Sequence, residues 1–354
     1  MMVASFAEFL NGDEPITRQT LSGWIRRLDA LRVYFPDGFD GPLEVSDREH
    51  RLSMLQWTAQ ALNLHGFPSR AIAMFERHDV ECANHGTELQ LATSLAQHGK
   101  SLRQAGRFRE ADAKNRLSLA VLDGLPGDAA LLMRAVTLTW HGMALAQRGA
   151  VGESEASFAE ALAIFSSRFA ESHRAVVAVF LAQRMLWEND PEQSAAQAEI
   201  AWTISWPLES DPTHTDKWGA RKIAASAARN WGESLVLLGD VEQGLTKLHQ
   251  AYSMANETCF VEEMIPGLRA QAIAARLQGR THEARHSLDR IWPLTAAGPY
   301  PMYECEARME AARLHEAIGE QKRAEAQREL ALDLAIADGP PFSFHVRSLD
   351  EPVT

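Results

Sequence analysis

Apolar residues recur along this chain with the spacing of amphipathic helices, and the helical runs come in pairs separated by a single turn residue. In LRQAGRFREADAKNRLSLA, residues 102–120, Gly106 stands between two such runs, and the small residue Ala111 follows five places later. A glycine between two helices lets the chain reverse, because a residue without a Cβ adopts positive φ angles freely. The segment therefore predicts a helical hairpin. Runs of β-branched residues, which would indicate strands, are scarce.

The hairpin pattern recurs through most of the chain. Its turn residues, at spacings of 40, 43, 40, 50, 40 and 40, are Gly66, Gly106, Gly149, Asn189, Gly239, Gly279 and Gly319. The residue five places after each turn is always small: Ala71, Ala111, Ser154, Ser194, Gly244, Ala284 and Ala324. Small side chains allow a close approach of two helices. Because four of the six spacings are equal, the pattern favours one unit repeated seven times over the alternative, a nonrepetitive helical bundle.

This pattern resembles the tetratricopeptide repeat over roughly residues 49–335. Its period is about six residues longer than that of the usual repeat, and this resembles the long-helix subclass of kinesin light chains and maltose-regulator-type bacterial transcription factors. The tryptophan-leucine-glycine signature of the family is missing from several copies. The resemblance implies an all-α, right-handed α-solenoid of about seven helix pairs. In such a solenoid the first helix of each pair lines the concave face and the second lines the convex face.

We expect three regions along the chain. Residues 1–48 are predicted to form an N-terminal helical cap and a loop, since the ends of a solenoid need polar-faced caps. Residues 49–338 form the solenoid, and residues 339–354 form a flexible tail. Two internal loops are predicted, WPLESDPTHTDKWG at 206–219 and WPLTAAGPYP at 292–301, and the first accounts for the 50-residue spacing.

Composition narrows the class of protein. The net charge of −12 argues against general binding to nucleic acid or anionic membranes. Three scattered cysteines are too few for a disulfide framework, which favours a reducing compartment. The first residues, MMVASFAEFLNGDE, lack the basic segment of a signal peptide, and no apolar run approaches the roughly 20 residues of a membrane helix. We therefore expect a soluble, acidic, cytoplasmic protein.

Projecting the repeat register onto the first helices places a polar set of side chains on the concave face. The predicted groove residues are Lys100, Arg103, Gln104, Gln147, Gln183, Trp187, Arg229, Glu233, Arg269, Arg276 and Arg313. Such a groove suits an acidic or carboxylate-ended peptide, because guanidinium groups bind carboxylates in bidentate fashion. Two alternatives remain: an ordinary solvated helix face, and internal ion pairs in which Glu233, Glu306 and Glu316 neutralise neighbouring arginines.

Aromatic residues on the predicted first helices also admit two interpretations. They are Trp57, Trp140, Phe180, Trp187 and Trp231. They form either a hydrophobic floor for an anchor side chain of a ligand or the core between helices.

Two histidine clusters raise the question of a metal. HEARH at 282–286 places His282 and His286 four residues apart on one helix, the zincin spacing, and Glu306 follows as a third candidate ligand. The motif also lies in frame with the repeat, and ordinary packing explains half of it. The second cluster comprises His78, Cys82 and His98, for which the alternative is buried imidazoles satisfied by hydrogen bonds.

The sequence therefore predicts a non-catalytic scaffold or sensor that binds a protein or peptide and holds no cofactor. One alternative is the ligand-sensing module of a bacterial regulatory system, which the family resemblance implies. The other, from a different class, is a metal-dependent hydrolase that uses HEARH.

Overall fold

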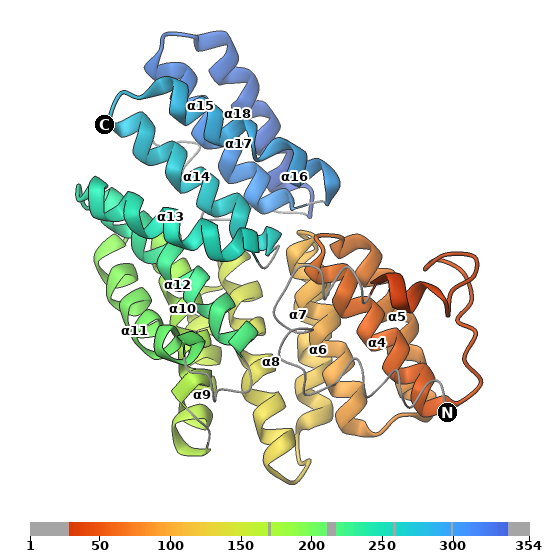
Figure 1. The fold of residues 1–354 in the computed structure, drawn as a ribbon. Coiled ribbons are helices and arrows are strands. Elements are labelled where there is room, and N and C mark those ends of the chain that lie inside the picture. The colour runs from red at the N-terminus through yellow and green to blue at the C-terminus, as the bar shows by residue number, and fades with distance from the viewer. Residues whose placement is uncertain (1–27, 169–170, 211–216, 258–259, 299, 339–354) are drawn as a thin grey trace.

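The computed structural model describes residues 28–168, 171–210, 217–257, 260–298 and 300–338, and the expected cap falls largely outside this range. Helices account for 83% of the described residues, which contain no strand. They are α4 (Arg48–Leu64), α5 (Pro68–His85), α6 (Glu88–Gln104), α7 (Phe108–Leu122), α8 (Asp128–Gln147), α9 (Val151–Arg168), α10 (Glu171–Trp187), α11 (Pro191–Ser210), α12 (Lys217–Leu237), α13 (Val241–Glu257), α14 (Val261–Leu277), α15 (Thr281–Asp289), α16 (Trp292–Ala297), α17 (Pro301–Ala317) and α18 (Gln321–Ile336). The chain is an all-α solenoid, as predicted (Figure 1).

Within the described ranges the solenoid consists of seven helix pairs, and the predicted turn residues separate the two helices of each of them. The first helices are α4, α6, α8, α10, α12, α14 and α17, and each is followed by its second helix. All seven turn residues have positive φ angles, including Asn189 at 60°. Asparagine tolerates this conformation better than other residues with a side chain, so it replaces glycine there without breaking the pattern.

The small residues after the turns lie where the two helices of a pair touch, and all seven are buried. In the fifth pair, a Cβ added to Gly232 of α12 would lie 2.8 Å from the carbonyl oxygen of Gly244 in α13. The backbones therefore meet without side chains between them. The core is divided among the pairs, and one cluster, for example, joins Leu102 and Ala111 to Ala144 of the following pair.

Enlarging one of these contacts tests the register. Ala111 is fully buried, so Ala111→Leu should overpack the α6–α7 contact and lower the free energy of unfolding by about 1–3 kcal/mol. Ala113, on the exposed face of the same helix, provides the matched control, and Ala113→Leu should change stability by less than about 0.5 kcal/mol. Equal denaturation midpoints for the two variants would show that the register is wrong.

The described parts of the two predicted loops are largely helical, where the sequence predicts irregular structure. Residues 206–210 belong to α11 and residues 217–219 to α12. Trp206 stacks on Trp202 with ring centroids 4.7 Å apart, which favours continuation of α11 by one more turn. Residues 292–297 form the short helix α16, whose Pro293 occupies its first turn, where a missing N–H is tolerated.

The solenoid curves until its last pairs pack against its first (Figure 1). The contact, which we call the seam, joins the turns at Gly66 and Gly106 to the segment around Gly298, Tyr300 and Pro301. A Cβ on Gly66 would lie 3.5 Å from the Tyr300 hydroxyl. Phe108, which follows the second turn, is completely buried in the hydrophobic core of the last two pairs. The seam therefore closes the superhelix on itself.

The most apolar helix, α8, is long and apolar enough to cross a membrane by length and composition alone. In the structure, 61% of the most apolar 18-residue stretch of α8 is buried, and α8 packs against α7 and α9. This is the environment of a core helix.

Candidate functional site

The predicted groove residues lie on first helices, and closure of the superhelix brings those helices face to face. Arg103 Nη2 in α6 donates to Glu262 Oε1 in α14 at 2.6 Å. Gln147 Nε2 in α8 lies 2.8 Å from Met302 Sδ in α17, and Trp187 Nε1 in α10 donates to Glu306 Oε1 in α17 at 2.8 Å. We call this shared surface of the first helices the inner wall.

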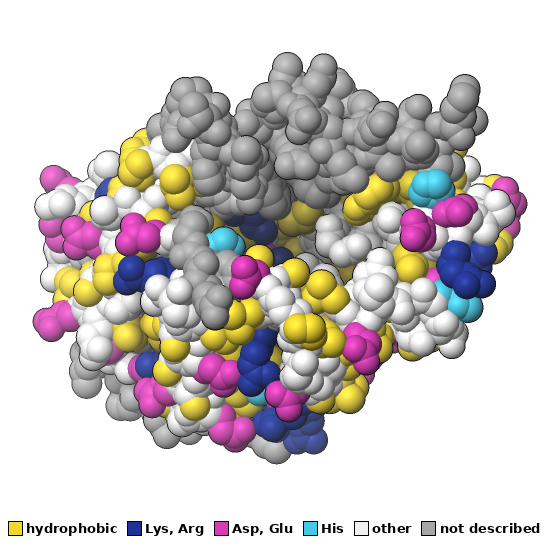
Figure 2. Space-filling model, turned by 90° about the horizontal axis from the view of Figure 1, so that it is seen from below, with side chains coloured by type: hydrophobic (Ala, Val, Ile, Leu, Met, Phe, Trp, Pro, Cys, Tyr) yellow, Lys and Arg dark blue, Asp and Glu magenta, His cyan; other side chains and the backbone are white. Residues whose placement is uncertain are grey.

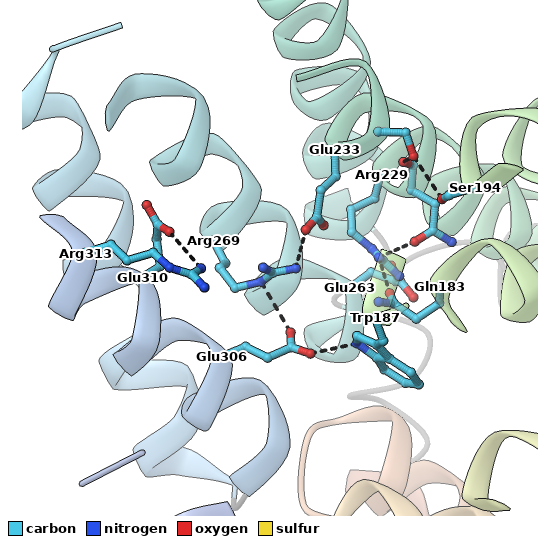
Figure 3. Close-up of polar contacts among 12 residues, drawn as sticks. Gln183, Trp187, Ser194, Arg229, Glu233, Glu263, Arg269, Glu306, Glu310 and Arg313 are labelled. Atoms are coloured by element: carbon cyan, nitrogen blue, oxygen red, sulfur yellow. Dashed lines mark hydrogen bonds and ion pairs between the residues drawn. The ribbon is translucent and has the colours of Figure 1, made fainter. Parts of the chain in front are cut away.

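The inner-wall arginines of the C-terminal pairs form a ladder of ion pairs (Figure 3). The pairs are Arg229–Glu263 at 2.8 Å, Arg269–Glu233 at 2.5 Å, Arg269–Glu306 at 3.3 Å, Arg276–Glu310 at 2.5 Å and Arg313–Glu310 at 3.7 Å. Gln183 and Asn230 also accept hydrogen bonds from Arg229. Each arginine predicted to hold an acidic ligand therefore already has a carboxylate partner within the chain.

These contacts favour internal ion pairs over the interpretation that the arginines bind an acidic peptide. The carboxylates involved differ in part from those that the sequence predicts. Glu263 and Glu310 contribute carboxylates that the sequence interpretation did not name, whereas Glu316 binds Arg328 instead. Arg229 and Glu233 are buried, each with 3% exposure, whereas the Arg313 side chain retains 31% exposure. Buried charges are costly unless they are paired, so removal of one member of a buried pair should lower the free energy of unfolding.

Elsewhere on the molecule the charges are mixed. On the face shown in Figure 2, acidic and basic side chains are interspersed among polar and apolar ones. Ion pairs outside the ladder such as Arg134–Glu160, at 2.8 Å, are partly exposed. Because such pairs are screened by water and salt, they contribute little to stability.

Three amide oxygens on the N-terminal part of the inner wall have no hydrogen-bond partner within the described structure. They are Asn63 Oδ1 on α4, Gln104 Oε1 on α6 and Gln147 Oε1 on α8, and we call them the amide row. All three residues are buried. Each lies two or three positions before its turn glycine, so successive repeats present the same kind of acceptor. A buried acceptor without a donor costs about 1–3 kcal/mol, which makes these positions candidates for ligand contacts.

A charged cluster lies beside the amide row. Glu262 accepts hydrogen bonds from Arg103 and from Gln104 Nε2, and the Tyr303 hydroxyl lies 3.5 Å from it. Burial alone would raise the pKa of Glu262, but the cationic groups around it, chiefly Arg103, hold the value at about 2. The carboxylate is therefore ionised at neutral pH.

Lys100 lies one helical turn before Arg103 on α6, and its ammonium is 5.5 Å from the centroid of the Trp140 ring. Burial lowers the pKa of Lys100 below its ordinary value, and the attraction of Glu262 opposes this effect. A cavity of about 10 Å³ opens between these groups, lined by Asn63, Leu64, Lys100, Gln104, Lys222, Phe260, Glu262 and Tyr300.

The aromatic residues fall into two groups, one packed against the core and one facing cations of the chain. Trp57, Phe180 and Trp187 pack against hydrophobic clusters, as the core interpretation predicts. The Trp231 ring lies 4.2 Å from the Lys247 ammonium, and Trp140 faces Lys100. Both rings therefore contact cations of this chain.

The candidate metal ligands do not converge. His282 and His286 are exposed on α15, whereas Glu306 is buried on the inner wall between Trp187 and Arg269. Within the described ranges, no three His, Cys, Asp or Glu residues form a group that could hold a metal ion. The three residues of the zincin interpretation therefore do not come together in the described structure.

The second histidine cluster is a hydrogen-bonded network. His78 Nδ1 lies 2.8 Å from Ser94 Oγ, and His98 Nδ1 lies 2.7 Å from Asp79 Oδ2. Cys82 Sγ is 3.4 Å from His78 Nε2. Burial raises the pKa of Cys82 to about 12 and lowers that of His78 to about 4, so the pair is neutral at physiological pH. The buried-imidazole alternative is correct for these residues.

Sequence reasoning missed the carboxylates that organise the inner wall. Glu262 and Glu263 open the first helix of the sixth pair, yet they bind Arg103 and Arg229, which lie 159 and 34 positions earlier in the chain. The only signal was a pair of adjacent acids on an inner helix. It could not identify the partners: Arg103 meets Glu262 only through closure of the superhelix, whereas Arg229 meets Glu263 from the preceding first helix, α12.

Comparison with known proteins identifies the fold. No protein-family model and no curated protein matches this sequence. Among solved structures, the chain is similar to the Rap conjugation gene regulator of the plasmid pLS20 in complex with the Phr* peptide, with 13% identity, 82% of this chain and 76% of the regulator covered, and a TM-score of 0.64. It is also similar to the apo form of RapI, with 7% identity, coverage of 80% and 97%, and a TM-score of 0.58. The chain therefore shares a helical-repeat fold with these proteins.

Proposed function

We propose that this protein is a non-catalytic scaffold that binds a peptide on its inner wall, as the sensor of a bacterial regulatory system. The observation that carries the proposal is the amide row, in which three successive first helices each present a buried oxygen without a hydrogen-bond donor. An extended peptide supplies such donors at regular intervals along its backbone. The sensor role is supported by the similar Rap protein, which is a gene regulator solved with a peptide.

The repeat type is part of the same proposal. We infer that the pairs belong to the long-helix subclass of tetratricopeptide repeats, and the support for this is the recurring 40-residue spacing. A peptide lying across α4, α6 and α8 would span about 20 Å, given interaxial distances of 8–10 Å. About six to seven extended residues cover that distance.

The proposal is tested by capture of random synthetic octapeptides on the immobilised protein, with the recovered sequences read by mass spectrometry. We expect the wild type to retain a restricted set of peptides. Gln104→Met combined with Gln147→Met removes two acceptors of the row and should reduce retention at least tenfold, the loss expected for about 1.4 kcal/mol. Gln321→Met, on the exposed start of α18, is the matched control and should retain the wild-type set. If the double variant keeps that set, the inner wall is not the binding surface.

A further inference from the structure

Among the predicted groove cations, Lys100 differs from the five arginines. Arg103, Arg229, Arg269, Arg276 and Arg313 each form an ion pair with a carboxylate. Lys100 forms neither an ion pair nor a hydrogen bond through its ammonium in the part of the chain that the structure describes, and its contact is with the face of Trp140. Among these six cations, Lys100 is therefore the one without an ion-pair partner in the described residues.

The nearby carboxylate does not satisfy Lys100. Glu262 is bound to Arg103 and Gln104, and three cations, Lys100, Arg103 and Lys222, surround this one carboxylate. Positive charge is therefore in excess where Lys100 is half-buried. A cation removed from water without a counter-ion is unfavourable, and the cation–π contact with Trp140 compensates only in part.

The surplus charge and the amide row meet at the same place. Asn63 and Gln104, whose amide oxygens lack donors, line the small cavity together with Lys100. A single chemical group would satisfy all of them: a carboxylate that accepts from the ammonium and is attached to a peptide whose N–H groups donate to the amide oxygens.

We propose that Lys100 binds a carboxylate of the peptide while Asn63 and Gln104 accept hydrogen bonds from its backbone, so that the ligand is an anionic peptide. This inference rests on the proposed function and specifies the chemistry of its ligand. The proposed site for the acidic ligand therefore lies on α4 and α6. The arginine ladder, where the sequence predicts this site, is paired within the chain. The carboxylate is either the C-terminus of the peptide or an Asp or Glu side chain.

The cavity also determines how such a ligand enters. At about 10 Å³ it has room for one water-sized group, which is smaller than a carboxylate. Glu262, on α14, forms the opposite wall. Binding therefore requires the walls of the cavity to move apart, so that the peptide carboxylate reaches the Lys100 ammonium.

The experiment uses four pools of random octapeptides on the immobilised full chain. Two pools have free C-termini and two are amidated, and within each type one pool contains Asp and Glu and the other excludes them. We expect the pools that carry a carboxylate to be retained at least tenfold over the amidated pool without acids, as for a charge-assisted hydrogen bond. Retention of the pool with free C-termini and no Asp or Glu would identify the C-terminus as the source of the carboxylate. Retention of the amidated pool that contains Asp and Glu would identify a side chain as the source.

Variants assign the effect to Lys100. Lys100→Met should abolish the preference for carboxylates, and Lys100→Arg should preserve it. Lys322→Met, at an exposed position of α18, is the matched control and should behave as the wild type. Far-UV circular dichroism of each variant establishes that it is folded. If Lys100→Met does not fold, Lys100→Gln replaces it with the same expectation.

The outcomes separate the two proposals. Equal retention of all four pools, with loss of retention in the Gln104 and Gln147 double variant, would overturn the anionic ligand and leave the peptide-binding function standing. A carboxylate preference that survives in a folded variant without the Lys100 charge would overturn the assignment to Lys100. Retention of no pool would overturn both proposals.

Discussion

Replacing Arg229 with methionine is expected to lower the free energy of unfolding by about 3–5 kcal/mol, the loss that follows when a buried ion pair loses one member. Arg229 is buried on α12 and donates to Glu263 on α14 at 2.8 Å. Removing the guanidinium leaves the Glu263 carboxylate without its counter-ion in a place that water reaches poorly. Urea denaturation followed by circular dichroism measures the loss.

The double variant Arg229→Met with Glu263→Met separates charge from packing. It should recover most of the lost stability, because apolar side chains of similar volume replace a buried ion pair at little cost. The matched control is Arg134→Met, which removes a partly exposed pair with Glu160 and should cost about 0–1 kcal/mol. Equal losses for Arg229→Met and Arg134→Met would contradict the buried ladder.

Gly298→Ala is expected to open the seam without unfolding the repeats. A Cβ at this position would overlap the carbonyl oxygen of Gly66, which belongs to the turn of the first pair. The backbone of Gly298 has φ −146°, which every residue adopts easily, so the steric effect acts on the seam alone. We expect the first and last pairs to separate, with a loss of about 1–3 kcal/mol or more from overpacking.

Small-angle X-ray scattering measures this opening as an increase in the radius of gyration, while the far-UV circular dichroism signal stays at the wild-type level. Gly152→Ala on α9 is the matched control, because a Cβ there meets nothing within 4 Å. It should leave the radius unchanged and stabilise the helix by up to about 1 kcal/mol. A Gly298→Ala protein with the wild-type radius would show that the seam does not hold the two ends together.

The features that could be predicted from sequence are those that every repeat specifies locally. The turn at Asn189 followed from its position in the period, and its positive φ angle of 60° confirms the assignment. Ala111 and Ala284 followed from the need for close helix contact, and both are completely buried. Such signals lie within about 20 residues of the positions that they describe, so periodicity is sufficient to detect them.

The inner wall could be predicted only in part, for a physical reason. The repeat register placed Arg103 and Gln147 on first helices, but it held no information about what lies opposite them. Their partners, Glu262 and Met302, are 159 and 155 positions away. Such contacts depend on the cumulative curvature of many pairs, which no single repeat encodes. The arginine ladder resembled an open cationic groove for a different reason: the carboxylates hydrogen-bonded to its arginines lie only 34 to 36 positions away on neighbouring first helices, and the register placed the arginines without showing which carboxylates face them.

The seam has a consequence for how the chain can change in evolution. Repeat proteins commonly diversify by duplication or loss of whole units, because each unit contacts only its neighbours. Here Gly298 meets Gly66 and Pro301 meets Gly106, so the number of intervening units determines whether those residues meet at all. Gain or loss of one 40-residue unit between the second and the sixth pair would carry Glu262 away from Arg103 and leave both charges without their partners. The number of units between the contacting residues is therefore constrained, and we expect descendants of this chain to diverge by substitution within units and by changes on the outer helices.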